Sequence, residues 1–426
     1  MHSLLVKFMF AGILAIVAVG AAASAEEPPT IAVSQRYGQS CRASVGGLPV
    51  LVLRGTHRER GEAHGFLGAR EIVKTCDAMA TAVNMMGEGD EGTTGWDAAK
   101  GMVGRFQFPE RFQAEIEGML RGIEKALPDP GDRTLAATGA ELTLEDLMVL
   151  QCGDVLELMR CSQFSAWGSL TPDGGTIIGR NWDYPPIFPH DTYCAFAVDP
   201  AEDDLQMTMD AMWFGMIGAG MACLNEEGVY LSGNDAGSED PSLVQSPVPG
   251  ALAIRITAET ARASDPLAAL ERNIDQKTAL ALLYHIVAPG GPDGQAPQAF
   301  VFEYAPGATG PFEARIRPPS ETLPDALILT NHTLLSGEGD GGSADRYARI
   351  ETALGDPSAR GKVDADAVRA ILDSVAASGP GTTTQYSAVV LPGRREVRIA
   401  VAPAPGEPAT KQEYVRLQWD AVFGLR

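Results

Sequence analysis

The residue best suited to covalent chemistry is Cys161. It lies where a helical pattern gives way to a β pattern, in the stretch MRCSQFSAWGSLTPDGGTIIGRNWDYPP. A thiol with an ordinary pKa near ~8.5 is mostly protonated at neutral pH, so it needs a base. If the peptide bond before Cys161 were broken, its own α-amine, with a pKa near ~8, would supply that base. The position therefore predicts an N-terminal cysteine nucleophile that needs no histidine.

The remaining cysteines and the histidines offer little competing chemistry. The six histidines are scattered, and His57 and His64 lie among acidic neighbours that favour a structural role. None of the six cysteines has the CxxC spacing of a zinc or thioredoxin-type site. Cys41–Cys76 and Cys194–Cys223 are candidate disulfides, although spacing leaves the connectivity open. We expect neither a metal nor an organic cofactor.

A run of residues that begins at Cys161 resembles one known hairpin. Cys161-Ser162 is followed by Asp173-Gly174 in a predicted turn, and then by Gly179-Arg180-Asn181-Trp182-Asp183. This run resembles the nucleophile hairpin of the N-terminal nucleophile hydrolases, in the branch that contains the penicillin acyltransferases and the choloylglycine hydrolases. Its members carry Cys-Ser/Thr, a strand, an Asp-Gly turn, a second strand and Gly-(Arg/Gln)-Asn-x-Asp.

Motifs outside the hairpin extend the resemblance. ERGEAHG (59–65) is similar to a stretch near the start of acyltransferase precursors, and LTLEDLMVLQCGDVLEL (142–158) to the helix before their cleavage point. TNHT (330–333) and the S-x-x-R of Ser343–Arg346 are similar to their downstream motifs. The resemblance is discontinuous and runs from about residue 50 to about residue 390.

The resemblance implies a role for each matching residue of the hairpin. Cys161 would be the nucleophile, first for cleavage of the bond after Arg160 and then for the substrate. Asp183 would hold the Cys161 α-ammonium group, and Arg180 would favour the thiolate, as a nearby cation does. The residues alone leave another reading open, because Asp183 also suits a turn before Tyr184-Pro185.

Three residues further along the chain complete the implied site. Asn234 and Asn331, each at the end of a predicted strand, would stabilise the oxyanion through their side-chain amides. Arg346 would anchor charge. Asn234 also suits an ordinary turn, and Arg346 also suits a surface position.

The sequence before the nucleophile reads as mostly helical. In residues 26–160 a possible strand at Leu48–Leu53 precedes helices entered at Thr56, Pro109 and Thr143. Residues 86–104 read as a loop because they are rich in Gly, Asp and Thr.

After residue 161 strands dominate. Strands are predicted at 165–170 and 176–181, at 216–224 and 229–233, at 300–304 and 326–330, and in a closing hairpin around 392–393, with helices over 250–287. This order favours an α+β fold with antiparallel sheets and separate helical layers. The resemblance implies the four-layer αββα sandwich of the N-terminal nucleophile hydrolases.

The N-terminus reads as an export signal. Lys7 precedes an apolar run that ends at Ala23-Ser24-Ala25, and this run is shorter than the ~20 residues of a membrane span. An uncleaved anchor helix is the alternative. We divide the chain into a signal peptide (1–25), a helical N-terminal segment (26–160) that is a propeptide or a separate chain, and the nucleophile chain (161–426), and expect a secreted or periplasmic protein.

Charge excludes some partners. The formal net charge of −22 opposes nucleic-acid binding and adhesion to anionic membranes. The expected partners are a small N-acyl amide substrate and, for the two processed chains, each other.

The expected reaction is hydrolysis of a linear amide C–N bond through an acyl-enzyme. Acyl transfer to an amine, phospholipase-like acyl hydrolysis and non-catalytic binding by an exported protein remain alternatives. Arg180, at a position where acyltransferases often have Gln, favours hydrolysis. Arg160 departs from the small Gly that precedes the cut in some precursors, and the sequence leaves the acyl group open.

Overall fold

The computed structural model describes residues 29–87, 94–153, 160–236, 247–273, 282–290, 296–305, 313–334 and 341–425. The predicted signal peptide (1–25) lies outside these residues. In the described part of the chain, no helix is both long and apolar enough to cross a membrane.

After β6 the described residues contain more strand than helix. The strands are β1 (Ile31–Tyr37), β2 (Ser40–Val45), β3 (Leu48–Gly55), β4 (Thr134–Leu135), β5 (Ala140–Glu141), β6 (Arg160–Ala166), β7 (Ile177–Tyr184), β8 (Tyr193–Pro200), β9 (Thr208–Trp213), β10 (Cys223–Asn225), β11 (Tyr230–Asp235), β12 (Leu282–Ala288), β13 (Gln298–Ala305), β14 (Glu313–Arg317), β15 (Ala326–Leu329), β16 (Thr383–Leu391), β17 (Glu396–Val401) and β18 (Val415–Gln418). The helices are α1 (His57–Leu67), α2 (Ala69–Met86), α3 (Gly95–Val103), α4 (Glu110–Ala126), α5 (Leu144–Gln151), α6 (Gly250–Ala258), α7 (Ala268–Asn273), α8 (Gly341–Gly355), α9 (Ala365–Ser374) and α10 (Trp419–Phe423).

Two sheets hold the molecule together. Among the described residues, the larger sheet has 10 strands in the order β1-β2-β3-β8-β9-β10-β11-β12-β13-β14, and the smaller sheet has 6 in the order β15-β6-β7-β16-β17-β18. Neighbouring strands are antiparallel except for β3 and β8, which pair in parallel from Val50–Ala195 to Gly55–Pro200. The N-terminal strands and the strands after Cys161 therefore share one sheet.

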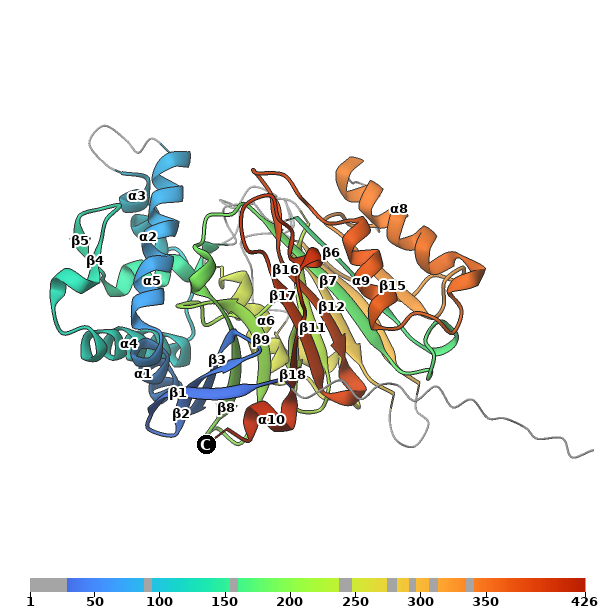
Figure 1. The fold of residues 1–426 in the computed structure, drawn as a ribbon, viewed down its shortest axis with the longest axis horizontal. Coiled ribbons are helices and arrows are strands. Elements are labelled where there is room, and N and C mark those ends of the chain that lie inside the picture. The colour runs from blue at the N-terminus through green and yellow to red at the C-terminus, as the bar shows by residue number, and fades with distance from the viewer. Residues whose placement is uncertain are drawn as a thin grey trace, which may run out of the picture.

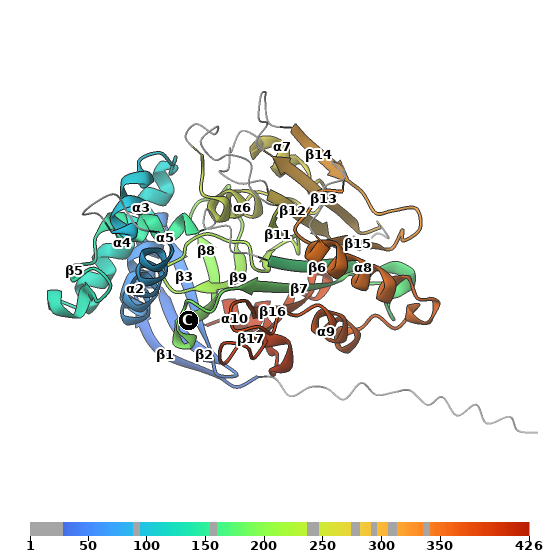
Figure 2. The same ribbon diagram turned by 90° about the horizontal axis from the view of Figure 1, so that it is seen from above.

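Helices cover the outer faces of both sheets. On the smaller sheet, Phe164, Ile177 and Val389 pack against α8 and α9. On the larger sheet, Leu231 and Ile286 pack against Ile254 of α6 and Leu270 of α7, and Figure 2 shows the two pairs of helices on opposite sides of the sheets. This arrangement is the predicted αββα sandwich. Figure 1 shows α1–α5 gathered at one end of the molecule, beyond β3.

Several predicted elements are confirmed by their caps. Thr56 begins α1 in a capping box with Glu59, and Thr143 begins α5 in a capping box with Asp146. The helix entered at Pro109 spans Glu110–Ala126. In each case a local signal sets the start of the helix, so the sequence alone suffices.

Other predictions are wrong, each for a physical reason. The possible strand at Leu48–Leu53 is confirmed as part of β3, but β1 and β2 are strands as well, so the mostly helical reading of 26–160 fails before residue 48. Thr94 caps α3 in a capping box with Asp97, so 95–103 is helix rather than loop. Within the predicted helical region 250–287, Leu282–Ala288 is a strand buried along its whole length, and a continuous apolar run does not distinguish a buried strand from a helix.

The predicted strand over 216–224 is reduced to β10, three residues long. Gly215 has φ +94° and Gly220 has φ +146°, so the chain before β10 takes conformations that strands exclude. The resulting irregular segment, Phe214–Ala222, is called the wall loop below.

The candidate disulfides are wrong. Cys41, Cys76, Cys194 and Cys223 are buried thiols. Cys194 lies on β8 and Cys223 on β10, with β9 between them. Strands two apart are separated by about 9.5 Å, more than the ~7 Å that the Cα atoms of a disulfide span.

Candidate active site

The β6–β7 pair places alternate residues on opposite faces of the smaller sheet. Cys161 lies opposite Trp182, and Gln163 lies opposite Arg180, so these four side chains share the face toward the larger sheet. Asp183 pairs with Arg160 and belongs to the outer face, toward α8 and α9. The predicted site is thus divided between two faces.

The turn between the two strands fixes this register. Thr171 Oγ1 donates to Gly175 O at 2.8 Å, and Gly175 N donates to Asp173 Oδ1 at 3.0 Å. Gly174 has φ +74°, a conformation that favours glycine. A one-residue slip would move the thiol to the outer face, so the turn is a condition for the site.

The Cys161 thiol is buried beside a cation. Its exposed fraction is 0%, and Arg180 Nη2 lies 3.7 Å from Sγ. Burial raises the pKa of the thiol to about 11, and the positive charge of Arg180 opposes that rise. Arg180 acts in the expected direction, but burial dominates, so the thiol of the uncut chain is protonated at neutral pH.

Arg180 is a buried guanidinium held by neutral groups. Nη1 donates to Asn234 Oδ1 at 2.6 Å, Nη2 donates to Gly233 O at 2.8 Å, and Trp182 lies against it with its ring centre 5.3 Å from Cζ. In the described part of the chain, no carboxylate forms an ion pair with it. Among the described groups that contact Arg180 by hydrogen bonds, the Cys161 thiol is the one that can become an anion.

The backbone of Cys161 is held from the other side. Cys161 N donates to Asn331 Oδ1 at 2.7 Å, and Arg346 Nη2 donates to the same oxygen at 2.9 Å. Arg346 Nη1 donates to Cys161 O at 2.5 Å and to Ser162 Oγ at 2.9 Å. Asn331 follows β15, which pairs with β6, and Arg346 lies on α8. Both residues orient the nucleophile's main chain.

Asp183 is buried on the outer face of the smaller sheet. Its Oδ1 accepts a hydrogen bond from Thr384 Oγ1 at 2.5 Å. Burial raises the pKa of the carboxyl to about 6, while the Thr384 hydrogen bond and the charges of Arg346 and Arg180 oppose the rise. The carboxyl therefore titrates in a range where a proton-handling group is useful.

Two side-chain amides lie at the site, as expected from the sequence. Asn234 Nδ2 donates to Thr330 O at 2.8 Å, and Asn331 Nδ2 donates to Asp235 O at 2.7 Å. An amide carries two N–H donors, so each retains one for an oxyanion. Asn331 also has a function that the sequence does not predict, because its Oδ1 receives the Cys161 N–H.

Gln163 is a site residue that the sequence alone does not single out. Its Nε2 donates to Asn234 Oδ1 at 2.7 Å, and its Oε1 accepts from Tyr230 Oη at 2.9 Å. It therefore fixes which way the Asn234 amide points. The available signal is its position two residues after Cys161, since alternate strand residues share a face.

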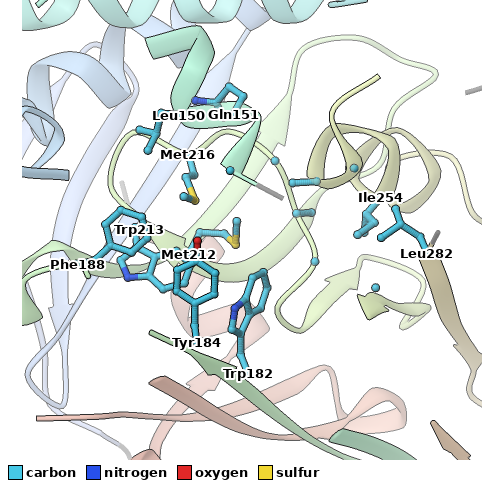
Figure 3. Close-up of a pocket in the computed structure, with 17 residues that line it drawn as sticks. Leu150, Gln151, Trp182, Tyr184, Phe188, Met212, Trp213, Met216, Ile254 and Leu282 are labelled. Carbon is cyan, nitrogen blue, oxygen red and sulfur yellow. The ribbon is translucent and has the colours of Figure 1, made fainter. Parts of the chain in front are cut away.

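An apolar pocket opens beside these groups (Figure 3). It is lined by aromatic and methionine side chains and by glycines, and Trp182, opposite Cys161, is part of its lining. The aromatic and methionine residues are Trp182, Tyr184, Phe188, Met212, Trp213 and Met216. The cavity volume is about 50 Å³, room for a few water molecules, so a bound acyl group requires side chains to move. Met212 and Met216 are suited to this because methionine is flexible.

No metal site accompanies the pocket. Within the ranges that the structure describes, no three His, Cys, Asp or Glu residues are grouped to hold an ion. His57 Nδ1 contacts Glu115 Oε2 at 2.6 Å, and His64 Nε2 accepts the Gly215 N–H at 3.0 Å, so both lie in structural contacts.

Comparison with known proteins gives similarity at the level of structure. No protein-family model and no curated protein sequence matches the chain. Similar solved structures include two variants of a conjugated bile acid hydrolase from Clostridium perfringens, 10% identical over 62% of this chain and 95% of theirs, with TM-scores of 0.37 and 0.39. Penicillin V acylase from Agrobacterium tumefaciens is 13% identical over 57% of this chain and 84% of its own, with a TM-score of 0.37. At these values the function has to be inferred from the chain's own side chains.

Proposed function

We propose that the protein is an exported cysteine hydrolase that cleaves itself before Cys161 and then cleaves the linear amide bond of an N-acyl substrate. The observation that carries the proposal is that separate groups contact the side chain and the main chain of one residue. Arg180 contacts the Cys161 thiol, while Asn331 and Arg346 hold its backbone N–H and carbonyl. A structural cysteine needs neither arrangement.

These contacts of Cys161 support self-cleavage. The Cys161 thiol attacks the Arg160 carbonyl carbon, the C–N bond breaks, and the nitrogen takes the proton to become the Cys161 α-amine. Water then cleaves the thioester, which leaves a carboxylate on Arg160 and restores the thiol. The new α-amine accepts the thiol proton in the next reaction, and Asp183 neutralises the resulting ammonium group.

Substrate cleavage uses the same atoms. The activated thiol attacks the amide carbonyl, the free N–H groups of Asn234 and Asn331 stabilise the oxyanion, and the α-ammonium group donates a proton to the leaving amine. Water then hydrolyses the acyl-enzyme to release the acid. Arg180 stabilises the thiolate whenever it forms.

The pocket supports an uncharged, apolar acyl group as substrate. Among the described residues, its lining contains no charged side chain. Gln151, the one side-chain amide among these described lining residues, already donates to Leu147 O and Gly215 O and accepts from Ile217 N. A charged acyl group would lose its hydration there without compensation.

The N-terminal segment remains bound after cleavage in this proposal. β3 pairs with β8 along six residue pairs, and Leu150, Gln151 and Gly153 line the pocket. The two processed chains therefore share a sheet and a binding site. Export rests on the signal-peptide pattern of residues 1–25.

Intact-mass analysis of the purified protein tests self-cleavage. The wild type should give two chains that co-purify, the second beginning at Cys161, whereas Cys161→Ala should stay whole. Cys223→Ala is the matched control, since Cys223 is also fully buried but lies on β10, and it should be cut like the wild type. A wild type that remains one chain would exclude the self-cleavage step.

Hydrolysis is tested with N-acyl amides of increasing apolar size. The cut wild type should release amine from at least the aryl-acyl members, and Cys161→Ala should release none. Equal turnover by both proteins would exclude Cys161 as the nucleophile.

A further inference from the structure

The wall loop lies between two cavities. Met216, Gly218 and Ala219 line the apolar pocket described above. The same residues line a second cavity of about 20 Å³, whose other lining residues include His64, Glu115, Asp210 and Arg255. One stretch of irregular backbone is thus shared between an apolar pocket and a cavity that includes charged side chains.

Side chains from the N-terminal segment hold the first part of the wall loop. Gln151, at the end of α5, donates to Gly215 O at 2.8 Å and accepts from Ile217 N at 2.9 Å. His64, on α1, accepts the Gly215 N–H at 3.0 Å. Burial lowers the pKa of His64 to about 3, so its ring is neutral and Nε2 is an acceptor.

Two buried charged residues, Asp210 and Arg255, bind further backbone groups of the wall loop. Asp210 Oδ2 accepts from Gly220 N at 2.8 Å, and its Oδ1 accepts from Ala222 N at 2.6 Å. Arg255 Nη1 donates to Ile217 O at 2.6 Å and forms an ion pair with Glu115 of α4 at 2.8 Å. These side chains thereby satisfy the backbone N–H groups of Gly215, Ile217, Gly220 and Ala222 and the carbonyls of Gly215 and Ile217.

Apart from Met216, the wall-loop residues that line the pocket are Gly218, Ala219 and Gly220, which have little or no side chain to adjust. Gly218 has no room for a Cβ, which would lie 2.4 Å from the Ala251 Cβ. Gly220 has φ +146°, which side chains rarely allow. Here the backbone itself forms the surface that a ligand would meet, so a displacement of the loop changes the shape of the pocket directly.

We propose that Gln151 and Asp210 are positioning residues that set acyl-group specificity by fixing the wall loop. The inference rests on the proposed function, because it assigns the apolar pocket to the acyl group. It also places part of the specificity on the N-terminal segment, since Gln151 precedes the cleavage point. Neither side chain offers a free polar group to the substrate.

Near-isosteric variants test this role. Gln151→Glu keeps the acceptor for Ile217 N–H and replaces the donor to Gly215 O with a repelling oxygen. Asp210→Asn replaces one of two acceptors with a donor. Gln206→Glu is the matched control, because Gln206 is a fully buried amide that donates to Ala261 O and lies outside the pocket lining.

The readout is kcat and KM for acetyl and arylacetyl amides of one amine. In Gln151→Glu and Asp210→Asn, KM for the arylacetyl amide should rise about tenfold, the effect of one lost hydrogen bond. The acetyl amide is too small to reach the wall loop, so its KM, and kcat for both substrates, should stay within twofold. Gln206→Glu should leave the arylacetyl-to-acetyl ratio of KM unchanged.

A direct binding measurement separates this inference from the proposed function. Phenylacetamide binding to Cys161→Ala protein, followed by calorimetry, should weaken about tenfold when Gln151→Glu is added and not when Gln206→Glu is added. If wild type hydrolyses no amide, the proposed function fails and this measurement still decides the inference. Equal affinities, no binding to Cys161→Ala, or equal KM ratios in the hydrolysis series would overturn it.

Discussion

The two faces of the β6–β7 pair handle different parts of the same nucleophile. Toward the larger sheet, the Cys161 thiol meets Arg180 in a buried setting with no carboxylate partner in the described part of the chain. Toward α8, the main chain of Cys161 is held by Asn331 and Arg346, and Asp183 lies on that same outer face. Under the proposed mechanism, the sheet therefore separates the attacking thiol from the groups that control the α-amine.

The separation explains how one site can hold both a cation and a carboxylate. Arg180 and Asp183 are only three positions apart on β7, but strand alternation puts them on opposite faces. Each retains its own influence on Cys161, because the charge of Arg180 lowers the pKa of the thiol and that of Asp183 raises it. A direct ion pair between them would cancel both effects.

The largest expected effect comes from removing the cation on the thiol face. Arg180→Met keeps much of the apolar stem and should reduce kcat/KM about 10³-fold, because thiolate and oxyanion charge lose a preorganised partner. The fold should persist, since an apolar side chain replaces a buried charge. Steady-state kinetics with an arylacetyl amide and thermal unfolding measure the two effects.

Asn181→Ala is the matched change on the outer face. Asn181 Nδ2 donates to Leu372 O at 2.8 Å, and its Oδ1 accepts from Ser387 Oγ at 2.7 Å. Its loss should reduce the free energy of unfolding by about 2 kcal/mol, with kcat/KM within threefold of wild type. The comparison of the two faces breaks down if Arg180→Met retains activity or Asn181→Ala abolishes it.

A smaller effect is expected from the pH dependence of Asp183. The pKa of this carboxyl is about 6 in the uncut chain, and the α-ammonium group formed by the proposed cleavage lowers it, so kcat/KM should fall about tenfold for each pH unit below a break that lies under that value. Asp183→Asn should be poorly active at every pH and should lack this slope. A pH–rate profile that keeps the same slope in the variant would assign it to another group.

Asp183 also links function to stability. Its pKa is raised from 3.8 to about 6, so the folded protein binds the proton more tightly than the unfolded chain. Stability due to this group is present at low pH and is lost as pH rises through about 6. Asp183→Asn should therefore raise the free energy of unfolding at pH 8, by up to about 3 kcal/mol, and change it little at pH 4. Urea unfolding at both values measures the difference.

The smallest effect is expected from a residue that acts on Cys161 through Asn331. Ser343 Oγ accepts the Asn331 N–H at 2.8 Å, and Ser343→Ala removes this support. We expect kcat to fall about fivefold with KM unchanged, about 1 kcal/mol. Ser320→Ala is the control, because Ser320 Oγ accepts the Leu323 N–H at 3.1 Å in an exposed turn. An equal fall in both variants would mean that Asn331 needs no such support.

Sequence and structure agree best where the signal is local. The Asp173-Gly174 turn and the capping boxes of α1 and α5 depend on residues within a few positions of one another, whereas the predicted strand over 165–170 is wrong beyond Ala166, where β6 ends. Cys161, Arg180 and Asp183 could therefore be selected together from one motif. Asn331 could also be selected, because it lies at the end of a predicted strand.

Contacts between the sheets lie beyond the reach of sequence patterns. Gln163 acquires its role from Asn234 and Tyr230, which belong to the larger sheet. The apolar residues of the wall loop suit a strand, which is why the sequence predicts one over 216–224. In the sequence, its glycines alone indicate an irregular segment. Its polar partners, Gln151 on α5 and Asp210 on β9, lie far apart in the chain and contact the loop only when α5 has packed near β9.

The parallel pairing of β3 with β8 has a consequence for the order of events during synthesis. Arg54 and Asp199, on these two strands, are 145 residues apart, and the bond after Arg160 lies between them. Arg346, which holds the Cys161 carbonyl, is 185 residues from it. Under the proposed mechanism, a growing chain cannot cut itself before the ribosome has passed residue 346. A cut before β3 met β8 would turn loop closure into an encounter between two separate molecules. The late synthesis of Arg346 therefore delays self-cleavage until β3 and β8 are both available to pair.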